Sequence, residues 1–199
     1  MDAAAIVSRL VLAAGGLPEG LAQQLLRGAL DEVCRTTSVW REPRSFAVPE
    51  WHEARPGAKI ALPKVKSGVR RVGIVWLTLR GQRPPRALAP DVHAGVLVDR
   101  VGCVKAGDEL AWEDVLSPED GAGLAVVPGR VLSALAPAAV ELAKARAFEM
   151  PRRPWTDAAL AQAARVQYSR ELSDVLRREI TGNSRGPMVY ETPEAFFDE

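Results

Sequence analysis

The sequence MPRRPWTDAALAQ, residues 150–162, joins two stretches of helical periodicity through a short proline-rich corner. Pro151 and Pro154 exclude one continuous helix, because proline lacks the backbone N–H and disfavours helical geometry in the residue before it. Apolar residues recur at helical spacing on both sides of the corner. The stretch therefore predicts two helices that meet at a rigid turn of fixed angle, which is an αα-hairpin.

The start of the second helix is predicted from four residues of this corner. Thr156 is the expected N-cap, which puts Trp155 and Leu160 at the spacing of a hydrophobic staple. Asp157 then occupies the first helical position, where its carboxylate interacts favourably with the helix dipole. Trp155 is expected to cover the core at this helix start. The helix continues through apolar residues that repeat every four positions: Leu160, Ala164, Tyr168, Leu172, Leu176 and Ile180.

Helical periodicity also marks the first forty residues and the segment before the corner. Gly15 and Gly16 separate two N-terminal helices. The second of these has a broad apolar face, formed by Leu21, Ala22, Leu25, Leu26, Ala29, Leu30, Val33 and Cys34. The acidic residues Asp31 and Glu32 fall on its polar face and are expected to be solvated. The helix before the corner is expected to begin at Ser133 or Ala136, with Pro137 tolerated in its first turn.

Between these helical regions, proline and glycine interrupt the chain every eight to twelve residues. Short β-like runs lie between the interruptions, at residues 45–48, 59–62, 69–79, 95–100, 103–106, 109–116 and 123–127. The longest run is apolar on both faces, with Val72, Ile74 and Trp76 on one and Val75, Leu77 and Leu79 on the other. Helices do not alternate with these runs, so an antiparallel sheet or sandwich is expected.

These patterns predict an α+β fold with a C-terminal tail. An antiparallel bundle of about four helices is expected from residues 1–43 and 131–181. A small antiparallel β module is inserted at residues 44–130, and an extended tail covers residues 182–199.

The tail GNSRGPMVYETPEAFFDE combines a formal charge of −3 with an unusual apolar content. Its apolar residues, expected to serve as docking anchors, are Met188, Val189, Tyr190, Phe196 and Phe197. Tails that stay disordered are usually poor in aromatic residues. The segment is either a frayed terminus or a docking peptide that becomes ordered on a partner.

Composition excludes several classes of function. The 199 residues carry a net charge of +1, so no global field attracts nucleic acid or an anionic membrane. No stretch approaches the roughly 18 apolar residues that a membrane span requires. The apolar N-terminal run does not have the pattern of a signal peptide, because Asp2 precedes it and Arg9 interrupts it.

The sequence contains no recognisable catalytic motif. His52 and His93 do not have the spacing of a zinc site, and Cys34 is expected to be a buried, inert thiol on an apolar helix face. Cys103 falls in a predicted strand and is interpreted in the same way. Phosphate-binding loops and nucleophile elbows are also missing. We therefore expect a protein that is not an enzyme and has no catalytic, cofactor-binding or metal-binding residues.

Three passages resemble the head-to-tail adaptor, or connector, proteins of tailed bacteriophages. The passage LAQQLLRGALDEVCRTTSVWRE, residues 21–42, looks like the opening helix of that family. The proline- and glycine-rich β insertion that follows matches in kind. The passage VELAKARAFEMPRRPWTDAALAQAARVQYSRELSDVLR, residues 140–177, is similar to the closing helical hairpin of the family.

The resemblance implies a structural virion protein, assembled in the host cytoplasm and located at the head–tail interface. It implies a homo-oligomeric ring, commonly of twelve copies, docked under the portal protein. The other implied partner is a tail, stopper or nozzle protein, and double-stranded DNA would pass through the lumen without sequence specificity. The C-terminal segment would lodge against portal subunits, and the corner would direct that segment. The alternative is a non-enzymatic accessory module that binds a regulatory or DNA-processing partner.

Overall fold

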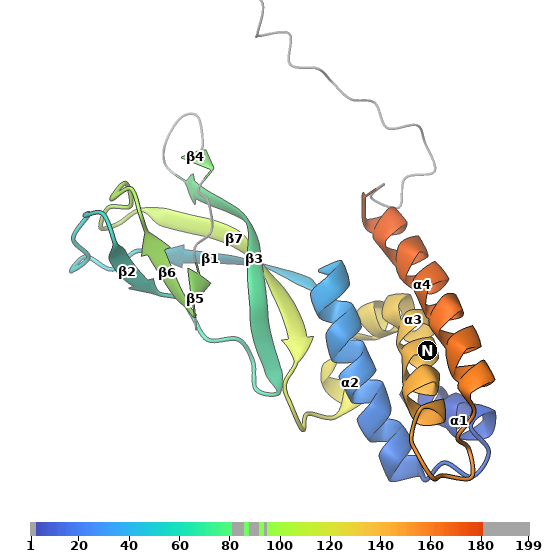
Figure 1. Cartoon of the computed structure of the whole chain (residues 1–199). Coiled ribbons are helices and arrows are strands. Elements are labelled where there is room, and N and C mark those ends of the chain that lie inside the picture. Colours follow the sequence, from blue (N-terminus) through green and yellow to red (C-terminus); the bar gives the residue numbers. More distant parts are fainter. Residues whose placement is uncertain (1–2, 81–85, 88–91, 94, 181–199) are drawn as a thin grey trace, which may run out of the picture.

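The computed structural model describes residues 3–80, 86–87, 92–93 and 95–180 (Figure 1). Within these residues the chain is an α+β protein with four α-helices and small antiparallel sheets. The predicted fold class is confirmed at this level. The described strands all lie between the second and third helices in the sequence, and they are grouped beside the helices in space.

The helices pack around α3 (Gly129–Phe148), which contacts α1 (Ala3–Ala13), α2 (Glu19–Thr37) and α4 (Ala158–Ile180). Twelve of the 20 residues of α3 are buried, so this helix is apolar nearly all round, as a central helix must be. Many of these buried residues are alanines, which allow neighbouring helices to approach closely. No helix among the described residues is both long enough and apolar enough to span a membrane.

The start of α3 differs from its predicted start. The helix begins at Gly129, directly after the N-cap Pro128, and Pro137 therefore lies in its interior. Proline at that position removes one backbone hydrogen bond to the preceding turn. Sequence reasoning placed Pro137 in the first turn because proline is usually tolerated only there. The tight packing of α3 on three helices explains how the interior position is tolerated.

The strands form two sheets, with the orders β1-β7-β3-β4 and β2-β6-β5, and every pairing is antiparallel. Their bounds are β1 (Arg41–Ala47), β2 (Ala58–Ala61), β3 (Val69–Arg80), β4 (Arg86–Ala87), β5 (Val92–His93), β6 (Val96–Asp99) and β7 (Glu109–Pro118). Two predicted strands are wrong. Residues 103–106 belong to a loop, and residues 123–127 contain the 3-10 turn η1 (Leu124–Val126).

Two apolar clusters stabilise the fold. The helical core contains the buried faces of the four helices and also Trp40, Val69 and Leu116 from the neighbouring chain segments. The sheet core contains Val48, Ile60, Leu62, Ile74, Leu77, Leu79, Leu97, Val104, Leu110 and Trp112. Strand β7 contributes to both clusters, which explains why nearly all of its residues are buried.

The predicted division of β3 into two apolar faces is wrong. Its pairing with β7 shifts register between Arg71 and Gly73 and again between Val75 and Thr78. Each shift marks a bulge or irregularity, where an extra residue disturbs the strict alternation of side chains. Ile74 and Leu77, which strict alternation separates, therefore both lie in the sheet core.

Candidate functional site

The helix corner begins α4 one residue later than predicted. The Oδ1 atom of Asp157 accepts hydrogen bonds from the backbone N–H groups of Ala159 (2.8 Å) and Leu160 (3.0 Å). Asp157 is therefore the N-cap, because an N-cap side chain satisfies the free N–H groups of the first turn. The Thr156 hydroxyl instead donates to the Met150 carbonyl and accepts from the backbone N–H of Arg153 at 3.1 Å. Thr156 thus closes the loop before the helix.

The predicted hydrophobic staple is not the arrangement of this corner. Trp155 is partly buried against the helical core, as expected for a residue that covers a helix start. Leu160, its predicted partner, is 48% exposed, whereas the next residue, Ala161, is 3% exposed. Moving the N-cap to Asp157 rotates Ala161 into the inward position. Pro151 and Pro154 are exposed in the loop.

An ion pair connects α3 to α4 across the corner. Glu149 at the end of α3 accepts two hydrogen bonds from Arg165 of α4, at 2.5 Å from Nε and 2.8 Å from Nη2. The hydrogen bonds from Arg165 lower the pKa of the Glu149 carboxyl. Arg152 adopts a φ of 58°, which few residues other than glycine adopt. The corner is therefore held by side-chain contacts at both its ends.

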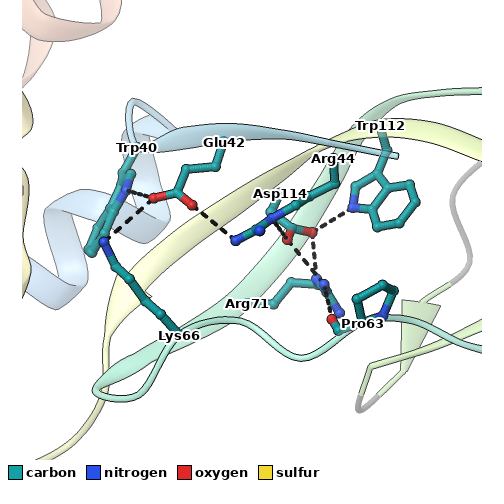
Figure 2. A network of polar contacts seen from close by, with 8 residues as sticks. All are labelled: Trp40, Glu42, Arg44, Pro63, Lys66, Arg71, Trp112 and Asp114. Carbon is teal, nitrogen blue, oxygen red and sulfur yellow. Dashed lines mark hydrogen bonds and ion pairs between the residues drawn. The ribbon is translucent and has the colours of Figure 1, made fainter. Parts of the chain in front are cut away.

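A buried polar network lies inside the first sheet (Figure 2). The Asp114 side chain of β7 is fully buried and accepts from Arg71 Nε (2.5 Å), Arg71 Nη2 (3.0 Å) and Trp112 Nε1 (2.7 Å). Arg44 Nε lies 3.4 Å from the second carboxylate oxygen, as an ion pair without hydrogen-bond alignment. Arg71 also donates to the Pro63 carbonyl at 2.8 Å. The network joins three strands to the chain after β2.

A second part of this network lies nearer the helices (Figure 2). Glu42 of β1 accepts from Trp40 Nε1 at 3.3 Å and from Arg44 Nη2 at 3.0 Å. Lys66 Nζ lies 3.7 Å from Glu42 Oε1 and 5.4 Å from the centroid of the Trp40 ring. Such a distance allows a cation–π interaction. These contacts anchor the segment before β3 to the junction of α2 and β1.

Asp31 joins α2 to the first sheet, which the sequence analysis did not predict. Its carboxylate accepts from Arg70 Nη2 at 2.5 Å and from the fully buried Ser117 hydroxyl, and it pairs with Arg35 at 3.2 Å. Burial raises the pKa of Asp31, but the hydrogen bonds from Ser117 and Arg70 and the nearby arginine charges outweigh it and lower the pKa overall. Glu32 pairs with Arg146 of α3. The prediction that Asp31 and Glu32 are simply solvated is therefore wrong, because both carboxylates are paired with arginines.

A hollow of about 650 Å³ runs beside the first half of β3. One wall is formed by β3 around Arg71, Val72 and Gly73. The opposite wall is formed by residues 61–67 together with Gly95 and Val96. A neighbouring hollow of about 500 Å³ shares the same three β3 residues and is also lined by Arg35, Ser38 and Arg70. The volumes lie in the range of ligand-binding clefts.

The remaining predicted residues are placed as follows. Cys34 is fully buried, as predicted, and burial together with the Asp31 charge raises the pKa of its thiol to about 12. Cys103 lies in the β6–β7 loop and not in a strand. The five anchors of the predicted docking tail, Met188, Val189, Tyr190, Phe196 and Phe197, lie outside the described residues. Within the described part of the chain, no group of three metal-ligating side chains is assembled.

The structure thus brings Pro151, Pro154, Trp155 and Thr156 together in one corner and turns Leu160 outward. The network around Asp114 and the hollow beside β3 were not predicted. The charged residues within 63–71 were the available sequence signal for this network, but the residues with which they form ion pairs and hydrogen bonds are distant in sequence. Comparison with models of known protein families and with characterised proteins finds no match.

Proposed function

We propose that this chain is a structural head-to-tail adaptor of a tailed phage, which forms a ring that joins the portal to tail components and lets DNA pass. The observation that carries the proposal is the position of α4. This helix runs antiparallel to α3 from the corner and ends at Ile180, directly before the acidic, aromatic C-terminal segment. Glu179 in its last turn pairs with Arg41 of β1 at 3.6 Å. The helices therefore fix the point from which the segment leaves the fold.

The proposal includes the finer architecture expected from the sequence. The helices of residues 1–43 and 131–181 form the bundle, residues 44–130 form the inserted β module, and residues 182–199 form the docking tail. The grouping of the described strands between α2 and α3 supports this division. Junction contacts such as Asp31 with Arg70 support a fixed orientation of the two parts.

Exposed apolar side chains on the outer faces of α1 and α4 support the contacts between subunits. Leu12 is 82% exposed, Leu160 is 48% exposed and Val166 is 45% exposed. An open hollow of about 590 Å³ on α4 is lined by Val166, Ser169, Arg170, Ser173, Asp174 and Arg177. Exposed apolar side chains on two different helices of one subunit would suit the head-to-tail contacts that close a ring.

The far end of the sheets supports a contact with a tail-side partner. Trp51 in the β1–β2 connection is 76% exposed, and Val101 in the β6–β7 connection is 65% exposed. The two connections lie at the end of the sheets remote from the helices (Figure 1). They approach so closely that a Cβ atom at Gly102 would lie 2.7 Å from Pro56. A firmly packed tip with exposed tryptophan is typical of a protein-binding surface.

The test uses the portal protein encoded by the same genome. The full chain is expected to be monomeric or weakly associated alone and to form a ring on the portal, as seen by light scattering and electron microscopy. Deletion of residues 187–199 should abolish portal binding and leave the fold intact, as judged by circular dichroism, because every described helix and strand precedes residue 181. A defined small oligomer without portal affinity would instead indicate an accessory binding module.

A further inference from the structure

The outer edge of β3 is only partly paired with another described strand. On one side β3 pairs with β7 along its length. On the other side, the described pairs are Thr78 with Ala87 and Leu79 with Arg86 of β4. Residues 69–75 therefore present an edge without a described strand partner. Such an edge is a template for an added strand, and exposed edges are usually blocked or used for binding.

The hollow of about 650 Å³, here called the slot, is lined by Val69, Arg71, Val72 and Gly73 of this segment of β3. Residues 61–67 form its far wall, and Arg71 holds that wall in place through its 2.8 Å hydrogen bond to the Pro63 carbonyl. Arg71 is itself fixed by the buried Asp114 (Figure 2). Val72, at the bulge, is 36% exposed in the slot. The position of this wall is thus fixed by Arg71 and Asp114.

The lining of the two hollows is basic. Lys64, Lys66 and Arg71 line the slot, against the single carboxylate of Glu119. Arg35, Arg70 and Arg71 line the neighbouring hollow, which has no acidic lining residue. Of the carboxylates that pair with these arginines, Asp114 is fully buried and Asp31 is 21% exposed, whereas Asp120, 3.8 Å from Arg70, is exposed. A bound segment would therefore be extended, to pair with the edge, and acidic.

The chain itself contains a segment of this chemistry. Residues 182–199 have a formal charge of −3 and include the run MVYET, residues 188–192, in which apolar and polar side chains can face opposite sides of a strand. The last described turn of α4 lies close to the basic surface. Glu179 pairs with Arg41, whose Nε donates at 2.8 Å to the carbonyl of Ser38, a lining residue of the second hollow. The seven residues 181–187 that join α4 to the proposed strand span at most about 23–25 Å when extended.

We propose that, in the unassembled subunit, residues 187–192 of the same chain bind along residues 69–75 of β3 as an added strand. This contact goes beyond the proposed portal contact and needs no portal for its formation. It would keep the anchors Met188, Val189 and Tyr190 engaged until the portal of the proposed function competes for them. The segment that occupies the edge of β3 is the chain's own C-terminal segment, and not a second copy of the chain or another protein.

The test is backbone hydrogen exchange of the full-length chain, followed by mass spectrometry over residues 69–75. Lys64→Glu changes the slot and Glu191→Lys changes the segment, and both are expected to speed exchange of this strand. The expected factor is about two- to fivefold, since one exposed charge pair changes an equilibrium by that amount. Lys105→Glu is the matched control, because this exposed lysine lies in the β6–β7 loop and outside the slot. It should leave the exchange unchanged.

The combined variant Lys64→Glu with Glu191→Lys restores opposite charges and should recover most of the protection. Protection should also survive about 50-fold dilution, because an intramolecular contact does not depend on protein concentration. Equal exchange in the wild type and in both single variants would overturn the proposal. The lysines would then serve only to prevent an unpaired strand edge from pairing with other chains. Loss of protection on dilution would also overturn it, by assigning the strand to another copy. Portal binding enters none of these measurements, so the proposed function is tested separately.

Discussion

The Asp114 carboxylate lies inside the first sheet, where it accepts hydrogen bonds from Arg71 and Trp112 and lies 3.4 Å from Arg44 Nε of β1. Its side chain is fully buried, and Arg71 is only 9% exposed. Removing one partner of a buried ion pair leaves the other charge without compensation, which costs more than the pair contributes. The residue therefore controls the stability of the sheet and of the slot beside β3.

We expect Asp114→Ala to lower the free energy of unfolding by about 3–5 kcal/mol, because the Arg71 guanidinium would remain buried without its carboxylate. Urea unfolding followed by circular dichroism measures this change. Glu113→Ala is the control, since the neighbouring carboxylate pairs with Arg41 at 3.9 Å near the surface. It should cost less than about 1 kcal/mol. Equal effects of the two substitutions would contradict the assigned role of Asp114.

Asp31 makes the stability depend on pH. Its folded pKa lies below the value of the unfolded chain, so its contribution is fully present above about pH 4, the unfolded pKa. The contribution is lost as the pH falls through the folded pKa. Asp31→Asn should therefore lower the unfolding free energy at pH 7 by about 1–3 kcal/mol, and the difference should shrink below pH 4. A difference that is constant between pH 7 and pH 3 would refute this assignment.

Sequence reasoning identified residues with local determinants and missed those with distant ones. Cys34 was correctly expected to be buried, because its position on an apolar helix face decides its environment. Asp31 was expected in solvent, yet its partners Arg70 and Ser117 lie 39 and 86 positions away. No helical or strand period encodes such a contact.

At the scale of elements, the corner between α3 and α4 both stabilises the helix pair and sets the direction of α4. Asp157 caps α4, Thr156 closes the loop, and the Glu149–Arg165 pair joins the helices. Trp155 packs against the helical core beside them. The corner was predicted from its two prolines. The cap position was wrong by one residue, because Thr156 and Asp157 are both good N-caps, and the predicted staple of Trp155 with Leu160 was wrong with it.

Under the proposed function, Trp155→Ala should weaken ring assembly on the portal, because the corner sets the direction of α4. The measurement is the fraction of portal rings that carry this chain in electron micrographs. Leu172→Ala is the matched control, since this half-buried α4 residue packs on the same core away from the corner. It should destabilise the subunit without lowering assembly at temperatures well below its unfolding transition. If Trp155→Ala docks as well as the wild type, the corner serves only stability.

The strands were predicted less well than the helices. Their existence follows from apolar runs between turns, and most of the runs are present. Their order does not, because β1 pairs with β7 across more than sixty residues of sequence. The bulges of β3 also break the alternation on which the predicted faces depended.

At the scale of the whole molecule, composition and patterning were sufficient for the α+β class. They could not predict the two separate cores or the slot beside β3, because both arise where distant strands meet. In the slot, Lys66 pairs with Glu42 and Arg71 pairs with Asp114. The chain as a whole is nearly neutral, with a net charge of +1.

The near-neutral charge makes a prediction about DNA. Non-specific DNA binding depends on lysine and arginine that neutralise phosphates, and its dissociation constants are typically about 10⁻⁴–10⁻⁶ M at physiological salt. The proposed function requires that passing DNA is not retained, so fluorescence anisotropy with a labelled duplex should show no saturable binding up to about 10 µM chain under these conditions. Weak binding that appears at low salt and vanishes with added salt would agree with this expectation. Saturable binding with a dissociation constant below about 1 µM at physiological salt would contradict it and would favour a DNA-processing accessory protein.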